Sequence, residues 1–242
     1  MRTIRRIILM LFESIIIFIL FTTIAENIVM NVKLNSFLDN QILDESLSTE
    51  TIKYYHKNNK SFKKRIDYLA APSFCDILVT TDSSVEIPLI YNILSNTVGG
   101  HAGLVGISYN DEYYSILTTD TIDTTLNDRA NCASIYSVFN WDDHYVFPSY
   151  YILRVELTEE EAIEVFNEAV SILGEPYNAT FLLNTDTTSY CSDLVAKAFS
   201  KVNINLNWDF GATTVIDLIV SRHTKIVGYK EYKNKVSYFY TY

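Results

Sequence analysis

One cysteine in the sequence has the context of a nucleophile. Cys191 lies in SYCSDLVAKAF, residues 189–199, where Ser189 is predicted as the N-cap of a helix with an apolar stripe. The first turn of a helix carries partial positive charge from unpaired N–H groups, which stabilises a thiolate and lowers the pKa of a thiol. We therefore expect Cys191 to be largely ionised near neutral pH. The alternative is a packed core thiol, because cysteine is among the most buried residue types.

A second stretch supplies a base for such a nucleophile. His101 lies in NTVGGHAGLVGI, residues 96–107, and four of the seven glycines of the chain fall between residues 99 and 106. This concentration of glycine indicates a bulge or a close approach of the backbone at the start of a strand. An imidazole on a sheet and a thiol at a helix N-terminus are the two parts of a Cys/His acyl-transfer site. A structural histidine is the alternative for His101 considered alone.

The composition argues against other classes of function. The net charge is -10 and the isoelectric point is about 4.8, whereas a nucleic-acid partner would need a dominant basic surface. The four histidines and three cysteines show no zinc-ligand spacing, so no metal or cofactor site is predicted. Three cysteines are an odd number, and at least one thiol is therefore outside any intrachain disulfide.

The N-terminus carries the clearest sign of location. Three arginines among the first six residues precede an apolar run at residues 7–25, close to the roughly 20 residues that span a bilayer. Positive charge on that side predicts a cytoplasmic N-terminus, with the remainder outside the cell membrane. A signal peptide cleaved near residue 25 is the alternative, and it would make the protein secreted. A buried N-terminal helix is the third interpretation.

The rest of the chain divides in two by composition. After the signal anchor or signal peptide of residues 1–25, residues 26–71 are predicted as a polar connector with a helix at 48–68, and 72–242 as one domain. Thr158 and Glu161 form a capping box that begins a helix, and a second helix is expected from Ser189. Runs that are rich in β-branched and aromatic residues and bounded by polar turns predict strands at 76–81, 102–109, 113–119, 132–139 and 150–157. One or two more strands are predicted within 225–242.

Four stretches together resemble a known family. APSFCDILVTT, GGHAGLVGI, EPYNATF and YCSDLVAKAF follow one another as in the permuted papain-like amidases of the NlpC type, the YiiX/YaeF-like group. The histidine precedes the cysteine, as the permuted order requires. The resemblance implies an α+β fold, in which a small, barrel-like antiparallel sheet packs against the cysteine helix. It also implies Cys191 as nucleophile, His101 as general base, and Tyr177 and Tyr190 near the substrate groove.

The third catalytic position departs from the family pattern. In the family, a polar residue on the strand after the histidine orients the imidazole, and the matching position in YYSILTTD, residues 113–120, holds Leu117. Thr118 and Asp120 are the candidates for this third catalytic member, together with Ser115, if the register slips. Without any of them, the site is a Cys/His dyad or a fold retained for binding.

The other two cysteines lack the context of Cys191. Cys75 begins a predicted strand, and Cys132 lies in or beside another, so neither is expected to be activated. Cys75 also marks a second departure, because the family usually has a glycine before the aspartate of its first strand, here Asp76.

These observations lead to one main functional hypothesis. The chain is expected to be an extracytoplasmic cysteine hydrolase that cleaves amide bonds, with cell-wall peptides or glycopeptides as substrates. A lipid acyl hydrolase or acyltransferase, similar to lecithin:retinol acyltransferase-like enzymes, is the alternative enzyme. A membrane-tethered binding protein that has lost catalysis is the alternative outside enzymes.

Overall fold

The computed structural model describes residues 2–57, 72–82, 100–107, 113–118, 133–178, 187–208 and 211–242. Its helices are α1 (Arg2–Leu38), α3 (Glu159–Ser171), α4 (Cys191–Ser200) and α5 (Val215–Val220), with a 3-10 helix η1 (Val138–Asp142). Its strands are β1 (Gln41–Leu43), β2 (Ile52–Lys57), β3 (Ile77–Thr80), β4 (His101–Ile107), β5 (Tyr113–Thr118), β6 (Ala133–Ser137), β7 (Ser149–Val155), β8 (Thr224–Lys233) and β9 (Val236–Thr241).

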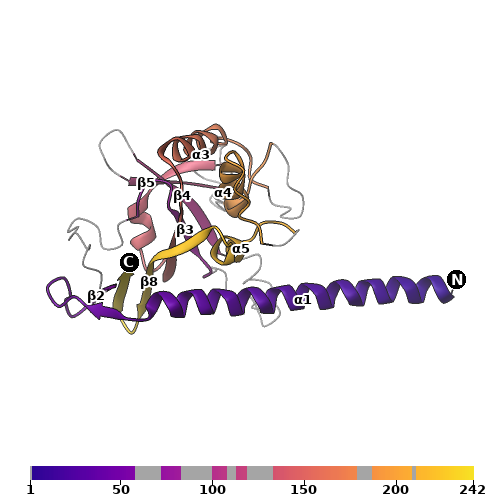
Figure 1. The fold of residues 1–242 in the computed structure, drawn as a ribbon, viewed down its shortest axis with the longest axis horizontal. Helices are drawn as coiled ribbons and strands as arrows, with labels where there is room; N and C mark the ends of the chain where they lie inside the picture. The colour runs from indigo at the N-terminus through magenta and orange to yellow at the C-terminus, as the bar shows by residue number, and fades with distance from the viewer. Residues whose placement is uncertain are drawn as a thin grey trace.

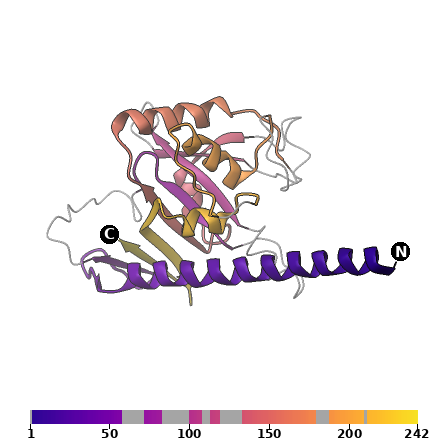
Figure 2. The same ribbon diagram turned by 45° about the vertical axis from the view of Figure 1, so that its right-hand side comes forward.

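The strands form one open sheet in the order β1-β2-β9-β8-β7-β3-β4-β5-β6. Neighbouring strands are antiparallel, except β2 and β9, which run parallel. The expected barrel-like closure is wrong: within the described residues, β1 and β6 are the two edges and do not pair. The physical reason is that β9 takes β2 as its outer neighbour, which lengthens the sheet at that end. Figures 1 and 2 show α3 and α4 side by side at one end of the domain and α1 along the other.

Strand alternation divides the core into two faces. In β4, Ala102 and Leu104 belong to the cluster that packs against α3, α4 and α5, which we call the helix face. Val105 belongs to the opposite cluster, which we call the aromatic face because Trp141 of η1 covers it. The remaining buried members of the aromatic face are Tyr54, Leu78, Tyr150, Ile152 and Phe239.

Most of the predicted elements are confirmed. The five strands expected between residues 76 and 157 correspond to β3–β7, and the C-terminal residues form β8 and β9. The capping box of Thr158 and Glu161 is present at the start of α3. The helix predicted at 48–68 is wrong over its described part, because residues 52–57 form β2, in which Tyr54 is buried on the aromatic face. Residues 48–51 are not helical either, and residues 58–68 lie outside the described part of the chain.

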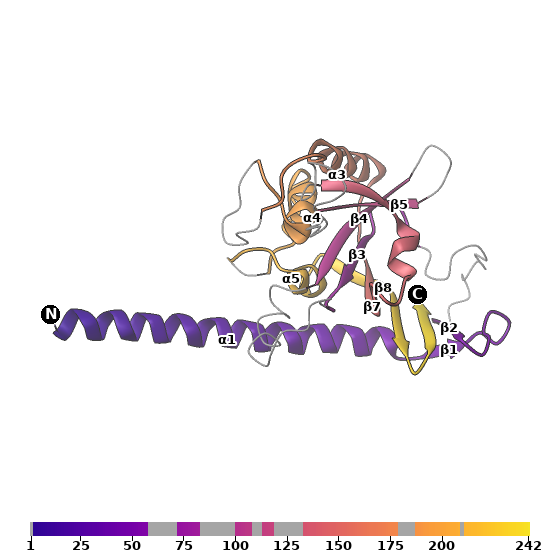
Figure 3. The same ribbon diagram turned by 180° about the vertical axis from the view of Figure 1, so that it is seen from behind.

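The helix α1 continues beyond the predicted apolar run to Leu38, so the first part of the predicted connector is helical. Among the described residues, α1 is the one helix that is long and apolar enough to cross a membrane, and a signal sequence passes the same test. Its second half packs on α5 and β8, where Lys33 Nζ donates to the carbonyl oxygens of Ile219 (2.9 Å), Ser221 (2.6 Å) and Thr224 (2.9 Å). The first half projects past the domain (Figures 1 and 3). The assignment of residues 72–242 to one domain stays a prediction.

The backbone just before β3 adopts a conformation at Cys75 that favours glycine, the residue that the resemblance leads one to expect there. Cys75 has a φ of 62°, in the left-handed region that favours glycine because glycine has no Cβ. Three contacts hold it there: its N–H donates to the Val105 carbonyl (2.9 Å), its Sγ donates to the Ala162 carbonyl (3.2 Å), and Asp76 accepts from Arg154 at 2.7 and 2.8 Å. The surrounding packing therefore maintains a strained residue.

Two substitutions at Cys75 measure this strain. Cys75→Ala keeps a Cβ in the left-handed conformation and removes the buried sulfur, so we expect the free energy of unfolding to fall by about 1 kcal/mol. Cys75→Gly removes the same sulfur but relieves the strain, and it should be about 1 kcal/mol more stable than Cys75→Ala. Urea unfolding of the detergent-solubilised chain compares them. An alanine variant as stable as the glycine variant would contradict the assigned strain.

Candidate functional site

The cysteine at the centre of the site is the first residue of α4, as the sequence predicts. The predicted N-cap is wrong, because the capping residue is Tyr190, whose side chain makes no capping hydrogen bond. The hydroxyl of Ser189 instead donates to Glu175 Oε2 at 3.2 Å. The N-cap side chain therefore does not bond to the first turn, and the N–H groups of Cys191 and Ser192 act on the thiol of Cys191.

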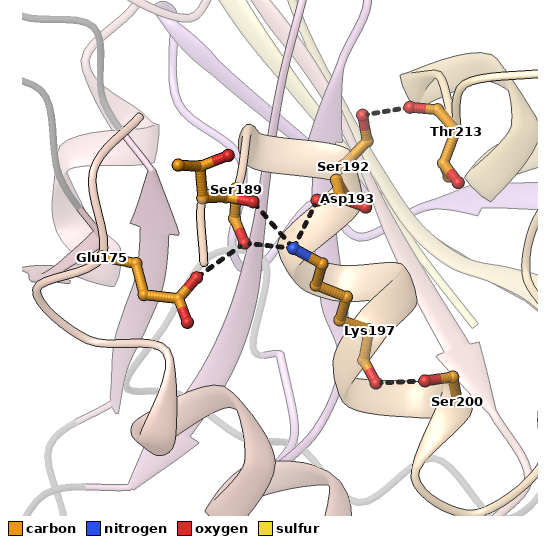
Figure 4. A network of polar contacts seen from close by, with 8 residues as sticks. Glu175, Ser189, Ser192, Asp193, Lys197, Ser200 and Thr213 are labelled. Atoms are coloured by element: carbon orange, nitrogen blue, oxygen red, sulfur yellow. Dashed lines mark hydrogen bonds and ion pairs between the residues drawn. The ribbon is translucent and has the colours of Figure 1, made fainter. Parts of the chain in front are cut away.

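A lysine later in α4 holds the segment that leads to Cys191 (Figure 4). Lys197 Nζ lies 2.8 Å from the Thr188 carbonyl oxygen, 2.9 Å from Ser189 Oγ and 2.9 Å from Asp193 Oδ2. Burial raises the pKa of the Asp193 carboxyl, and the Lys197 ammonium opposes that effect. These contacts fix the direction in which the chain enters α4. Sequence reasoning missed Lys197, and its spacing of four residues from Asp193 was the only signal.

Backbone hydrogen bonds join the same segment to residues that follow α3. The N–H of Asn178 donates to the Ser189 carbonyl (3.0 Å), and the N–H of Ser189 donates to the Pro176 carbonyl (3.2 Å). This bridge brings the two predicted groove residues near each other, with Tyr177 half-buried and Tyr190 buried. Their role in a substrate groove stays a prediction.

The thiol of Cys191 is subject to two opposed effects. Cys191 is 7% exposed, and this burial, the largest influence, raises the pKa of its thiol. The N–H groups of Ala102, Ser192 and Cys191 itself, with the hydroxyl of Ser192, lower it. The direction of the shift is therefore opposite to the one expected from the sequence, because the loss of hydration outweighs the N–H groups of the first turn.

The imidazole of His101, the first residue of β4, is stacked against two aromatic rings. Its centroid lies 5.8 Å from that of Trp141 and 6.0 Å from that of Phe147, with interplanar angles of 18° and 6°. Burial lowers the pKa of the imidazole to about 4, so the ring is neutral at pH 7. Gly100, before it, has a φ of 95°, and a Cβ there would lie 2.3 Å from the Thr80 carbonyl oxygen. The close backbone approach that the glycines predict is confirmed at this position.

The structure brings Cys191 to the start of β4, where His101 lies. The N–H that acts on the thiol belongs to Ala102, the residue after His101. Among the contacts of the described residues, none is a hydrogen bond between His101 and Cys191. A neutral thiol and a neutral imidazole suit proton transfer during attack rather than a resting ion pair.

The candidates for the third catalytic member lie at the end of β5 and beyond it. In the sheet, β5 is the neighbour of β4, and its Leu117 pairs with Ser134 of β6, while Thr118 pairs with Ala133. Asp120 lies outside the described residues. A catalytic role for Thr118 or Asp120 stays a prediction.

One family shares this order of histidine strand and cysteine helix. The family model described as permuted papain-like amidase enzyme, YaeF/YiiX, matches residues 89–215, just over half of the 242 residues, and both His101 and Cys191 lie within the match. The chain belongs to this family. A search of curated proteins and a search of solved structures gave no match. Membership confirms the resemblance seen in the sequence and supports a cysteine amidase kind of function.

In the described part of the chain, there is no group of three or more His, Cys, Asp or Glu side chains that could hold a metal ion.

The raised pKa of Cys191 predicts how its alkylation depends on pH. The thiolate is the reactive form, and burial holds the pKa above the usual 9.0, so labelling by iodoacetamide should still accelerate as the pH passes that value. Cys75, whose pKa burial raises to about 12, should label more slowly throughout this range. Mass mapping of alkylated peptides, from mildly acidic to alkaline pH, measures both thiols. Labelling of Cys191 that is already constant with pH below neutrality would instead reveal a resting ion pair.

Proposed function

We propose that this protein is a cysteine amidase that acts by acyl transfer, with Cys191 as nucleophile and His101 as general base. One observation carries the proposal. The thiol lies at the first residue of α4 and faces the N–H of Ala102, the residue that follows His101. The residue next to a sheet-borne histidine thus contacts the thiol of a helix-borne cysteine, in a chain of the amidase family.

The proposed reaction follows from a neutral resting pair. The sulfur of Cys191 attacks the amide carbonyl carbon while its proton passes to the imidazole of His101. The imidazolium then gives the proton to the leaving amine as the C–N bond breaks, which leaves a thioester. Water attacks the thioester with the imidazole as base, and the thiol is restored. The imidazole must come within hydrogen-bonding reach of the thiol in the substrate complex, and such contacts often tighten only there.

The negative charge that develops on the carbonyl oxygen requires donors close to the sulfur. The N–H groups of Ala102 and Ser192 both act on the thiol of Cys191. Such N–H groups, with others of the first turn of α4, are the donors that stabilise an oxyanion in a site of low dielectric. Burial therefore has two effects, because it suppresses the resting thiolate and strengthens the stabilisation of the transition state.

We further propose that α1 anchors the domain outside the cytoplasmic membrane, where cell-wall peptides are the amide substrates. The arginines before the apolar run support this orientation. The alternative of a lipid acyl hydrolase or acyltransferase is favoured by one feature of α1. Through Lys33, its second half bonds to the end of α5 and the start of β8, which keeps the domain close to the apolar segment. A domain held in this way would meet lipid esters at the bilayer surface.

Hydrolysis by the full chain in detergent tests the proposal. We expect the unaltered protein to release amino groups from cell-wall peptides, and Cys191→Ser and His101→Ala each to lose about a thousandfold or more of that rate. Cys75→Ala is the matched control, since it removes a buried thiol of the same domain and should retain activity.

Two other outcomes decide between the alternatives. Release of fatty acid from phospholipid, without cleavage of peptides, would support the lipid hydrolase. No product from either substrate, with Cys191 still open to alkylation, would support a binding protein and contradict the proposal.

A further inference from the structure

The mechanism proposed above makes no use of a buried lysine on the aromatic face. Lys230 of β8 is 0% exposed, and its Nζ donates to the carbonyl oxygens of Asp142 (2.9 Å), Trp141 (3.3 Å) and Phe147 (3.4 Å). Removing an ammonium from water costs several kcal/mol unless hydrogen bonds and opposite charges replace the hydration. The three carbonyl groups are that replacement, and they all belong to one short segment of the chain.

This segment carries the two rings that stack on the imidazole. Trp141 and Phe147 stack on each other, with centroids 4.4 Å apart and an interplanar angle of 14°. Both rings are nearly parallel to the imidazole of His101. Lys230 bonds to the carbonyl groups of Trp141, in η1, and of Phe147, in the turn that follows. These bonds hold the turn in a position where the two rings stack.

Charged and polar groups around Lys230 keep its ammonium in place. Burial lowers its pKa, while the carboxylates of Asp142 and Asp143 oppose that change. Nζ lies 5.4 Å from the ring centroid of Tyr150, whose hydroxyl donates to Asp142 Oδ1 at 2.7 Å. The ammonium is thus surrounded by acceptors and by an aromatic ring that attracts cations.

We infer that Lys230 is a positioning residue, which holds Trp141 and Phe147 so that they set the plane of the imidazole of His101. The inference rests on the proposed role of His101 as general base. Stacking fixes the plane of a ring without occupying its nitrogen atoms, and no contact among the described residues is a hydrogen bond to the His101 ring. The two aromatic rings thereby orient the imidazole of His101. The family pattern has a polar residue for this role at the position that Leu117 occupies in this chain.

The test follows the titration of His101 by NMR in the full chain carrying 13C-labelled histidine. Lys230→Met removes the ammonium and keeps the length of the side chain. The stack should loosen, and the midpoint of His101 should move from about 4 towards 6.5 as water reaches the ring. Labelling of Cys191 by iodoacetamide at neutral pH should fall by about tenfold or more, since the base is misplaced. Lys225→Met is the matched control, because this exposed lysine of the same strand pairs only with Glu156 in the described structure, and it should change neither value.

A second pair of variants leaves Lys230 intact. Trp141→Phe keeps an aromatic ring at this position and should leave the midpoint near its original value, whereas Trp141→Leu removes the ring and should move it towards 6.5. An unchanged midpoint in both Lys230→Met and Trp141→Leu would overturn the inference, and so would faster labelling of Cys191 in Lys230→Met. The titration needs no turnover. A failure of the proposed function would appear separately, as labelling of Cys191 that does not respond to His101→Ala.

Discussion

The site depends on one packing contact, in which the N-terminus of α4 lies against the start of β4. The buried stripe of α4, Leu194, Val195 and Ala198, packs on the helix face of the sheet with Ala102 and Leu104. Alanine at position 102 is small enough to let the first turn of the helix approach the strand closely. That approach puts the thiol of Cys191 against the N–H of the residue after His101.

Burial acts on the two groups in opposite directions. It raises the pKa of the Cys191 thiol, and, beside Trp141 and Phe147, it lowers the pKa of the His101 imidazole to about 4. These shifts favour the neutral form of both groups, and the neutral thiol is the less reactive form of a cysteine. Proton transfer then has to accompany attack on the substrate. In the proposed reaction, this proton transfer depends on the orientation of the imidazole, and the stack with Trp141 and Phe147 would set that orientation.

Local sequence patterns were sufficient to predict the elements, but not the contacts between distant residues. Runs rich in β-branched and aromatic residues predicted β3–β7, and a capping box predicted α3, because both signals depend only on near neighbours. β2 was predicted as a helix, since its pairing partner, β9, lies at the other end of the chain. The cysteine and histidine were visible through their residue types and flanking glycines. Lys230 was not, because its role comes from carbonyl groups more than eighty residues away in the sequence.

The formation of a thioester on Cys191 is the most direct test of the account. The full chain, mixed with an activated acyl ester and quenched in acid, is analysed by intact mass and by peptide mapping. We predict a single acyl group on Cys191 of the unaltered protein, and none on that residue in His101→Ala within the same time. Acylation of another side chain, or a rate of acylation at Cys191 that is equal with and without His101, would contradict the assignment of this pair as nucleophile and base.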